Sequence, residues 1–349
     1  MTFARNGWYC AALTAEVGDT PMARRILNQP IMLVRDAVGD VRAIGDRCPH
    51  RFAPLHQGVR DDDTIECPYH GLRFDLNGAC VFNPHGQGRI PAAAHVPSYP
   101  VVERDGVIWL WPGDPDLADP NQITDLQLID RGGRPPVSGY LMMPVDYRLV
   151  LDNLMDLSHA AYIHAGTLSP SRARRESQYD SDETSIRVHT QMRDVEAPSS
   201  QALYFGDPKG DYHSDIEWVF PGTLRQRLAM TDTDGDPDAG AVTRNAHLIT
   251  PETETSTHYF WIHTRNRRTD DTAIDERTRT IITNAFRTED EPMIAACQNY
   301  MDGAEFFSLQ PLYLETDYAG TRCRRAIEKR IESEARRAAV REPEHVGAA

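Results

Sequence analysis

The sequence lacks the features that membrane proteins and nucleic-acid-binding proteins need. No run approaches the roughly 18 consecutive apolar residues of a membrane span, and the amino terminus has no apolar stretch of the kind found in signal peptides. Basic residues are in the minority, with 37 Lys and Arg against 52 Asp and Glu, and the formal net charge is −15. Because an acidic surface repels phosphate groups, we expect neither a membrane nor a nucleic acid partner.

Cysteine is also scarce. The chain contains six cysteines, Cys10, Cys48, Cys67, Cys80, Cys297 and Cys323. They are too few and too scattered for a disulfide scaffold, so we expect a cytoplasmic protein, in which cysteines more often bind metal or take part in chemistry. No Gly-x-Gly-x-x-Gly follows a strand-like run and no flavin signature is present, so electrons for a redox reaction must come from a separate protein.

Proline and glycine divide the chain into two regions. The apolar content of 40% and the charged content of 26% are typical of globular proteins. A chain of 349 residues is long enough for two domains with separate cores. The segments 112–115 (Pro-Gly-Asp-Pro) and 118–120 (Ala-Asp-Pro) are typical of a linker. We therefore expect one domain at residues 1–115 and a second at residues 116–349.

The first region is predicted to be all-β. Strand-like runs at 72–74 and 79–82 flank Asn77-Gly78, and Asp105-Gly106 separates a second pair of runs. Both dipeptides favour a type I′ hairpin turn, in which both central residues have positive φ.

The second region mixes two kinds of pattern. Helix-like segments lie at 147–163, 272–285 and 322–340, and strand-like segments lie at 186–189, 241–249 and 258–262. This order predicts an α+β domain with helices on one side of an antiparallel sheet.

Two Cys-His pairs lie on expected loops of the first region. Cys48-Pro49-His50 follows a strand-like run, and Cys67-Pro68-Tyr69-His70 lies between two others. The cysteines are either core residues, ligands of a structural zinc, or ligands of a Rieske [2Fe–2S] cluster. Two matched pairs on facing loops argue against chance. The usual zinc-finger order places both cysteines before both histidines, whereas here the two residue types alternate.

A Rieske cluster accounts for this alternation. One iron of such a cluster takes two thiolates and the other takes two imidazoles, so each loop supplies one ligand to each iron. The imidazoles raise the reduction potential of the cluster, which then accepts electrons readily from a reductase. The expected ligands are Cys48, His50, Cys67 and His70.

A second metal site is expected in the second region. His159 and His164 are about 140° apart on an ideal helix, so both reach one metal only if the helix ends or widens by a π-type turn between them. Two histidines and one carboxylate form the facial triad of mononuclear Fe(II) oxygenases, whose open positions admit O₂ and substrate. The alternative is a pair of unrelated histidines, which fits less well in a chain that already carries an electron-transfer cluster.

These motifs resemble the oxygenase subunits of Rieske non-haem iron oxygenases, in particular the group of vanillate O-demethylase and dicamba monooxygenase. The resemblance covers nearly the whole chain, at segments 6–9, 48–51, 67–71, 152–159 and 250–255. It implies a Rieske [2Fe–2S] domain followed by a helix-grip catalytic domain that binds mononuclear Fe(II). It also implies a homotrimer and a partner reductase or ferredoxin.

The resemblance implies a carboxylate ligand late in the chain. Asp290 is the expected ligand, and the adjacent acids Glu289 and Glu291 are its rivals. Pro292 is expected to begin or kink a helix there, because proline lacks the N–H group that a helix interior needs.

Two further roles follow from the resemblance. Asp156 resembles the acid that connects the cluster of one subunit with the iron of the next, where its carboxylate accepts hydrogen bonds from His159 and from a cluster histidine. Asn153 resembles a residue near the iron that acts as a loose outer ligand. The alternatives are a surface acid for Asp156 and a buried amide for Asn153.

The implied activity is oxidative dealkylation of a small aromatic substrate. Two electrons and O₂ at iron hydroxylate a methoxy or N-alkyl carbon, and the product releases an aldehyde. His247 is an expected anchor for a substrate carboxylate or, alternatively, a core histidine, and Tyr259 and Trp261 are expected in the core. The competing functions are hydroxylation or cis-dihydroxylation at the same iron, electron transfer alone, and a zinc-stabilised binding module.

Overall fold

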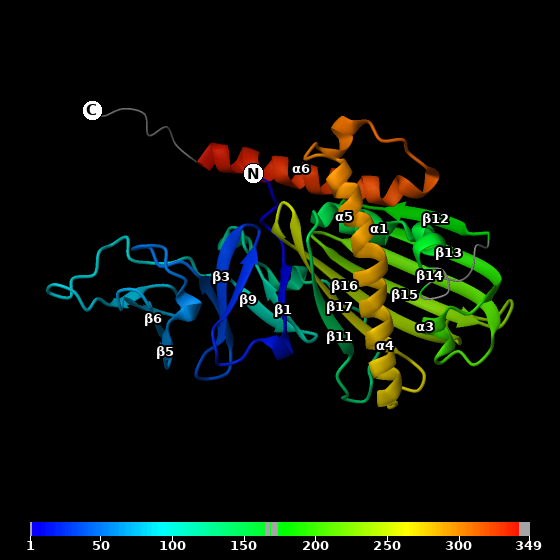
Figure 1. Cartoon of the computed structure of the whole chain (residues 1–349), viewed down its shortest axis with the longest axis horizontal. Coiled ribbons are helices and arrows are strands. Elements are labelled where there is room, and N and C mark those ends of the chain that lie inside the picture. Colours follow the sequence, from blue (N-terminus) through cyan, green and yellow to red (C-terminus); the bar gives the residue numbers. More distant parts are fainter. Residues whose placement is uncertain (1, 165–167, 169–173, 342–349) are drawn as a thin grey trace. The chain divides into compact units, whose positions relative to one another are not determined.

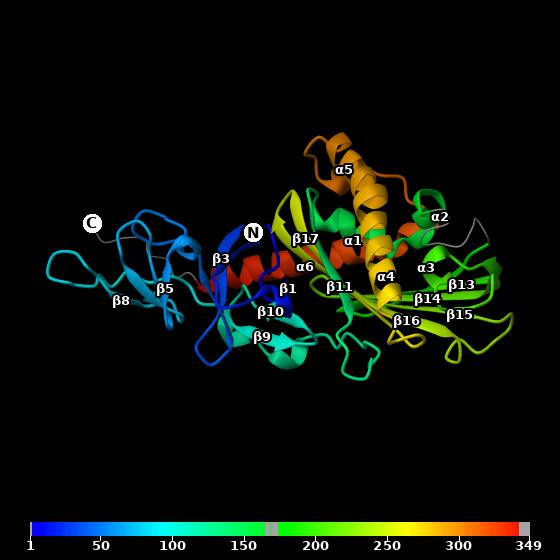
Figure 2. The ribbon, with the colours of Figure 1, turned by 60° about the horizontal axis from the view of Figure 1, so that its bottom comes forward.

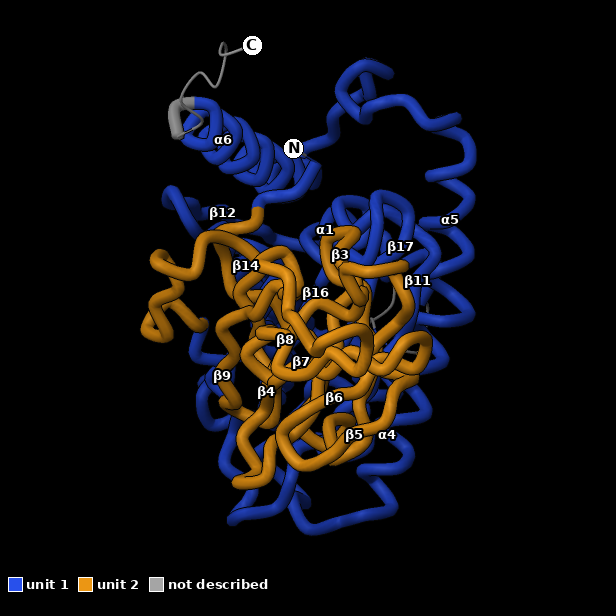
Figure 3. Tube along the Cα trace, turned by 90° about the vertical axis from the view of Figure 1, so that its left-hand side faces the viewer, with its two compact units in different colours: residues 1–4, 124–349 blue, residues 5–123 orange. Residues whose placement is uncertain are grey.

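The chain forms two compact units. The computed structural model describes residues 2–164, 168 and 174–341. Residues 5–123 form the N-terminal unit, and residues 1–4 with 124–349 form the C-terminal unit (Figure 3). The functional domain limits at residues 115 and 116 stay a prediction. Within the described part of the chain, no helix is both long and apolar enough to cross a membrane.

The N-terminal unit consists of three small antiparallel sheets. Their strand orders are β1-β10-β9, β2-β3-β4 and β5-β6-β7-β8. The strands are β1 (Tyr9–Leu13), β2 (Met22–Ile26), β3 (Gln29–Arg35), β4 (Val41–Gly45), β5 (Val59–Asp61), β6 (Thr64–Glu66), β7 (Arg73–Asp75), β8 (Cys80–Phe82), β9 (Val101–Arg104) and β10 (Val107–Leu110). This all-β architecture confirms the sequence prediction for the first region.

Both predicted hairpins are present, but only one of them has the predicted type I′ turn. Asp105 and Gly106 between β9 and β10 both have positive φ, as a type I′ turn requires. Between β7 and β8, only Gly78 has positive φ, and the strand register shifts by one residue. The reason is Asp75, whose carboxylate accepts hydrogen bonds from the backbone N–H groups of Asn77 and Ala79 and so holds a longer loop with a bulge.

The C-terminal unit is a seven-stranded antiparallel sheet with helices on one face. The strand order is β11-β17-β16-β15-β14-β13-β12, and α4 crosses one face of the sheet (Figures 1 and 2). The strands are β11 (Val137–Met143), β12 (Glu176–Ser181), β13 (Ser185–Glu196), β14 (Lys209–Val219), β15 (Thr223–Thr231), β16 (Ala241–Thr253) and β17 (Ser256–Arg265). The α+β prediction is therefore confirmed.

The helices of this unit agree with the three predicted helical segments and add short turns. The α-helices are α1 (Tyr147–Met155), α2 (Ala160–Ile163), α3 (Ser199–Ala202), α4 (Thr272–Asn284), α5 (Glu291–Tyr300) and α6 (Tyr318–Arg341). A 3-10 turn (Leu157–His159) precedes α2, and a π-helical turn (Ala285–Asp290) connects α4 to α5. The other 3-10 turns of this unit are Phe306–Leu309 and Glu315–Asp317, and those of the N-terminal unit are Thr14–Glu16, Leu55–Gln57, Pro115–Leu117 and Pro120–Gln122.

Buried ion pairs attach the helices to their neighbours. On α4, the Asp275 carboxylate accepts from Arg265 of β17 at 2.5 Å and from Arg131 at 2.7 Å. Burial alone would raise the pKa of Asp275, but the two guanidinium groups outweigh it and lower that pKa. On α1, Asp152 pairs with the buried Arg324 of α6 at 2.6 Å. Because removing one partner of such a pair leaves a buried charge, these contacts hold α1 and α4 in place.

Candidate metal centres and pocket

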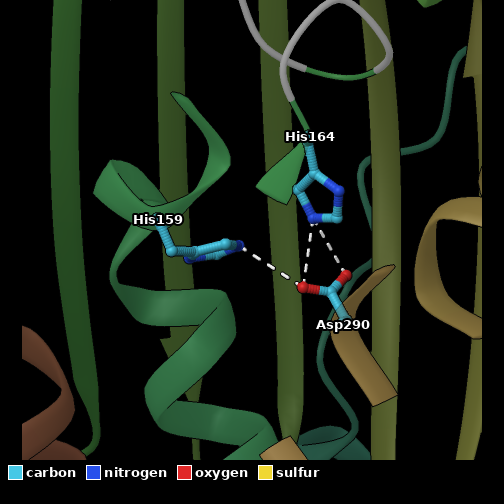
Figure 4. Close-up of side chains that lie close together, drawn as sticks. All are labelled: His159, His164 and Asp290. Carbon is cyan, nitrogen blue, oxygen red and sulfur yellow. Dashed lines mark hydrogen bonds and ion pairs between the residues drawn. The ribbon is translucent and has the colours of Figure 1, made fainter. Parts of the chain in front are cut away.

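His159, His164 and Asp290 converge in the C-terminal unit. Their ligand atoms all lie within 4.8 Å of one another (Figure 4). His164 Nε2 is 3.0 Å from Asp290 Oδ2, and His159 Nε2 is 3.5 Å from Asp290 Oδ1. His164 and Asp290 are buried, whereas the His159 side chain is 23% exposed. The structure thus brings together the two histidines and the acid that the sequence pointed to.

The helix containing the histidines changes form where the geometry requires it. The α1 helix ends at Met155, and His159 closes the following 3-10 turn. The short α2 helix then ends at Ile163, and His164 has non-helical backbone angles, with φ −109° and ψ 24°. The predicted helix end between the two histidines is present, and their rings lie edge to face with centroids 5.4 Å apart.

Asp290 reaches the site from a distorted helix. The turn at Ala285–Asp290 is π-helical, and α5 begins at Glu291 with Pro292 in its first turn. Proline donates no N–H to the preceding turn, and π-helical turns often occur at functional sites. Of the two rival acids, Glu289 instead contacts His164 at its other ring nitrogen, and Glu291 is not part of the converging group.

The hydrogen bonds of the two rings leave Nε2 of each histidine facing the acid. His159 Nδ1–H donates to the Asp156 carbonyl at 2.5 Å, and His164 Nδ1–H donates to the Glu289 carboxylate at 2.6 Å. Burial lowers the pKa of His159. For His164, burial also acts downward, but the bonds to Asp290 and Glu289 outweigh it and raise the pKa.

A cation fits this arrangement. Two imidazole Nε2 atoms and a carboxylate face one point, and the buried Asp290 carboxylate has His164 Nε2 3.0 Å from its Oδ2. Two histidines and one carboxylate are the donor set of mononuclear Fe(II) sites with open positions. Hydrogen bonds from ring Nδ1 to a carbonyl and a carboxylate are typical of metal-binding histidines.

Asn153 and Asp156 are both close to these residues, with different contacts. Asn153 Nδ2 donates to Asp290 Oδ1 at 2.9 Å and lies 3.4 Å from His159 Nε2. The Asp156 carboxylate accepts from the backbone N–H of Ser158 at 2.8 Å. The predicted hydrogen bond from His159 to Asp156 is present, but the predicted acceptor is wrong. The main-chain carbonyl of Asp156 accepts the bond instead of the carboxylate. A 3-10 turn directly after Asp156 folds the carbonyl toward the ring.

The two Cys-His loops of the N-terminal unit repeat one backbone conformation. Cys48 N–H donates to Ala53 O, and Cys67 N–H donates to the equivalent Leu72 O. The residue four positions after each cysteine donates back to it and has positive φ, 62° at Phe52 and 70° at Gly71. A bulky side chain in this region is uncommon, so the shared conformation is a specific feature of both loops.

The side chains on these two loops include two buried thiols and two neighbouring imidazole rings. Cys48 and Cys67 are buried, at 1% and 2% exposure, and the rings of His50 and His70 are 4.4 Å apart. Burial and the neighbouring Cys67 raise the pKa of Cys48 to about 11. His70 Nδ1 is buried without a partner among the described residues.

A single zinc ion fits these four residues less well. Tetrahedral zinc at normal bond lengths holds its ligand atoms roughly 3.5–3.8 Å apart. Among the described residues, only the group of His159, His164 and Asp290 has three or more such atoms within 4.8 Å. The four loop residues form no such group among the described residues, and their alternating order suits a cluster with two irons.

A pocket adjoins the histidines and the acid. It has a volume of about 110 Å³ and reaches from these residues to the inner face of the sheet. His247 and Trp261 pair across β16 and β17 and both line it. His247 is buried, its Nδ1 is 2.7 Å from the Tyr259 hydroxyl, and burial lowers its pKa to about 4. Trp261 is buried, as expected, but also lines the pocket.

Sequence reasoning missed several polar residues on the pocket wall, among them a row of three on adjacent strands. Gln226, Asn245 and His263 lie side by side on β15, β16 and β17. Asn245 is two residues before His247, and His263 is two residues after Trp261. Alternate residues of a strand share a face, so the spacing of two residues could have placed Asn245 with His247 and His263 with Trp261. Recognising that all of them line one pocket required knowledge of which strands pair.

Comparison with known proteins agrees with this geometry. Residues 7–100 match the family described as "Rieske [2Fe-2S] domain", and residues 143–333 match "Vanillate O-demethylase oxygenase C-terminal domain". The chain is 40% identical to the oxygenase component of chloroacetanilide N-alkylformylase from Rhizorhabdus wittichii, over 96% of this chain and 97% of that protein. It is 39% identical to the oxygenase component of dicamba O-demethylase from Stenotrophomonas maltophilia, over 96% and 100%.

A solved structure has the same fold. The crystal structure of dicamba monooxygenase with non-heme iron and dicamba matches with a TM-score of 0.83 and 36% identity, over 97% of this chain and all of that chain. Similarity in sequence and in fold therefore extends over both units.

Proposed function

The chain belongs to the family of oxygenase components that join a Rieske [2Fe–2S] domain to a vanillate O-demethylase-type catalytic domain, and on that premise we propose that it dealkylates a small aromatic substrate. The observation that carries the proposal is the convergence of His159, His164 and Asp290 beside a pocket in the C-terminal unit. The relatives named above are, by their names, an O-demethylase and an N-alkylformylase. Both act by removing a carbon group from oxygen or nitrogen.

The overall reaction balances with O₂ as the oxidant. An aryl methyl ether, O₂, two electrons and two protons yield a phenol, formaldehyde and water. Mononuclear iron, when bound by His159, His164 and Asp290, supplies the activation of O₂. The cleaved bond is the one between the ether oxygen and the oxidised carbon, and the proton of the new phenol is the one that the hydroxyl group on that carbon loses as it becomes the aldehyde.

The side chains of this chain bind and orient the reacting groups. Glu289 and the Asp156 carbonyl hold the two histidine rings, so that both Nε2 atoms face the same point. Asn153 holds the Asp290 carboxylate through a hydrogen bond of 2.9 Å. Apolar residues of α4, including Ile281 and Ile282, line the pocket and exclude water from it. His247 is proposed as a neutral polar contact for the substrate.

The cluster and the partners complete the proposal. Cys48, His50, Cys67 and His70 are the proposed cluster ligands, and the electrons come from a separate reductase or ferredoxin. The buried thiols and the more exposed imidazole rings direct the histidine side of the cluster toward its electron partners. We infer a homotrimer in which Asp156 connects the cluster of one subunit with the iron of the next. A cytoplasmic location stays a prediction from the cysteine content.

Product analysis tests the proposal. Purified protein with a generic reductase, NADH and O₂ is incubated with a panel of methoxybenzenes and N-alkyl anilides, and formaldehyde and other aldehydes are measured. Aldehyde in proportion to NADH consumed is the expected result. A cis-diol or a ring phenol without aldehyde would assign hydroxylation instead. Protein that reduces its cluster but binds no mononuclear iron would be an electron carrier.

A further inference from the structure

A further loop of the N-terminal unit contacts the second Cys-His loop. It follows β8 and spans residues 83–90, and we call it the third loop. The ring Nε2–H group of His85 on this loop donates to the main-chain carbonyl of His70 at 2.8 Å. A carbonyl oxygen only accepts hydrogen bonds, so the ring nitrogen is the donor. A side chain outside the four proposed ligands is therefore bonded directly to one of them.

The conformation of the third loop is set by its own sequence. The Asn83 side chain accepts from the His85 backbone N–H at 3.0 Å and donates to the Arg89 carbonyl at 2.7 Å. The Gly88 N–H donates to the His85 carbonyl at 3.0 Å, and Gly86 and Gly88 have positive φ. Asparagine side chains stabilise turns by bonding to nearby backbone groups, and glycine adopts positive φ without strain. These contacts hold the His85 backbone in one conformation.

The second Cys-His loop has a glycine where the third loop packs against it. Gly71 and Phe52 occupy equivalent positions in the two Cys-His loops, and both have positive φ. The Phe52 side chain is 70% exposed, so this backbone position accepts a side chain. At Gly71, an added Cβ atom would lie 3.2 Å from Pro84 Cγ of the third loop, closer than ordinary van der Waals contact. The close approach of the third loop therefore accounts for glycine at position 71.

The two proposed histidine ligands consequently differ in their support. Their loops share one backbone conformation, so the difference lies in what packs against each loop. Among the described residues, the His70 carbonyl accepts a side-chain hydrogen bond and the His50 carbonyl does not. The His70 and His85 rings have centroids 6.3 Å apart, so the donor lies beside the ring of the proposed ligand.

The bond to the His70 carbonyl affects charge as well as position. A carbonyl oxygen carries a partial negative charge, and an N–H donor offsets it. Reduction adds one negative charge to the cluster, so this offset stabilises the reduced form more than the oxidised form. Hydrogen bonds near a cluster are among the features that set its reduction potential. The His85 contact should therefore raise that potential.

We propose that His85 is a positioning residue for the Rieske cluster. It fixes the loop that carries His70 and, through its N–H group, favours the reduced form of the cluster. This inference rests on the cluster ligands of the proposed function and adds a residue that itself binds no iron. The readiness of the cluster to accept electrons then depends on a side chain outside the two Cys-His motifs.

Three variants of the full chain, loaded with cluster and iron, test this role. His85→Ala removes the donor. His85→Gln replaces the ring with an uncharged amide, whose NH₂ group can donate to the same carbonyl. His95→Ala is the matched control, because it changes another exposed histidine of the same unit, whose ring has no hydrogen bond among the described residues.

The reduction equilibrium of the cluster is the main readout. All proteins are held at the solution potential at which the original protein is half reduced. In His85→Ala, the ratio of reduced to oxidised cluster is expected to fall roughly two- to fivefold, the effect of up to about one hydrogen bond. His85→Gln should restore most of this ratio, which would also exclude the charge of histidine as the cause, and His95→Ala should leave it unchanged. An unchanged ratio in His85→Ala with normal cluster content would overturn the proposal.

Cluster loss to a chelator is a second measurement and uses a further variant. Asn83→Ala keeps the His85 ring but removes the two bonds that shape the third loop. Both Asn83→Ala and His85→Ala should lose the cluster roughly fivefold faster than the original protein, because the loop that carries His70 is held less firmly. Faster loss in His85→Ala without any change in the reduction equilibrium would contradict the proposal, since a purely structural contact alters only the rate of loss.

The original protein separates this inference from the proposed function. Protein that binds iron but contains no acid-labile sulfide would overturn the proposed function together with its cluster ligands. Protein that contains the cluster and releases aldehyde, but whose reduction equilibrium does not respond to His85→Ala, would support the function and overturn the role of His85.

Discussion

The two metal centres are built in opposite ways. In the N-terminal unit, the proposed cluster ligands come from two short loops that repeat one backbone conformation, Cys48 to His50 and Cys67 to His70. In the C-terminal unit, His164 and Asp290 are 126 residues apart and meet only because α2 and the π-helical turn end at the same place. The first centre depends on local loop geometry, and the second depends on how the helices pack over the sheet.

The surroundings of the two centres differ as well. The cluster cysteines belong to an apolar core of the N-terminal unit that also includes Phe74. The iron site is instead surrounded by polar contacts, with Glu289 and Asn153 bonded to its proposed ligands. A site formed by local loops should tolerate substitutions elsewhere in the fold. A site assembled from distant segments should lose metal affinity when the contacts that support its ligands are removed.

The largest expected effect comes from removing one ligand of each centre. His159→Ala is expected to lower iron from about three to about two per chain while the cluster spectrum is kept. Aldehyde formation should fall by roughly a thousandfold or more, because the oxidising metal is lost. Cys67→Ser should have the opposite result: the protein loses its acid-labile sulfide but still binds a divalent metal at the other site. Iron and acid-labile sulfide per chain, with the visible spectrum, measure both.

A matched variant controls for these substitutions. His189→Ala changes a half-exposed histidine of β13 that pairs with Asp215 and is not among the described residues that line the pocket, so this variant should keep all the iron and sulfide. Loss of the cluster in His159→Ala would mean that the two centres are not independent, contrary to the comparison.

Removing a side chain that supports the iron ligands is expected to have the next largest effect. Glu289→Ala removes the acceptor of the His164 Nδ1–H bond and is expected to weaken iron binding roughly 10- to 100-fold. Glu289→Gln keeps an oxygen acceptor and should retain most of the affinity. Competition with a chelator measures the affinity, and cluster content is the internal reference. Equal affinity in the Ala variant and the original protein would show that this contact does not support the site.

Acid should act on the C-terminal unit through two buried histidines. The folded pKa is about 4 for His247 and about 3 for His263, below the value near 6.5 in the unfolded chain. The unfolded chain then binds more protons, so stability is present above pH 6.5 and is lost as the pH falls toward the folded pKa values. Each histidine should account for about 2 kcal/mol between pH 7 and pH 5.

Denaturant unfolding at both pH values checks this prediction. In His263→Leu, the loss of stability between pH 7 and pH 5 should be about 2 kcal/mol smaller than in the original protein. An identical loss in both proteins would exclude His263 as a source of the acid sensitivity.

The smallest expected effect compares two aspartates with the same role in the two units. Asp75 accepts two backbone N–H groups in the turn between β7 and β8, and Asp271 accepts two at the start of α4. Replacing either with Ala should cost about 1 kcal/mol. Asp75→Ala should lower the temperature of cluster bleaching, and Asp271→Ala should lower the temperature of helix loss in far-UV circular dichroism. If each variant shifts both signals equally, the two units unfold as one.

The sequence by itself determined the elements and the ligand types. The alternating Cys-His pairs indicated the cluster because the ligands of each loop are neighbours in the chain, and the period of the apolar residues indicated the α+β order. It also identified His159, His164 and the three adjacent acids, and it required a helix end between the histidines. The hairpin at Asn77-Gly78 was correct, but its type I′ turn was wrong because the Asp75 side chain, rather than the dipeptide, sets the conformation of that loop.

Only the tertiary structure decided which acid faces the histidines and what surrounds them. Three consecutive acids are equivalent in sequence, and the π-helical turn directs Asp290 inward while Glu289 contacts the outer nitrogen of His164. The row of Gln226, Asn245 and His263 on the pocket wall likewise forms only once three strands are in register. Contacts between distant segments depend on strand pairing and helix packing, and local sequence patterns do not specify either.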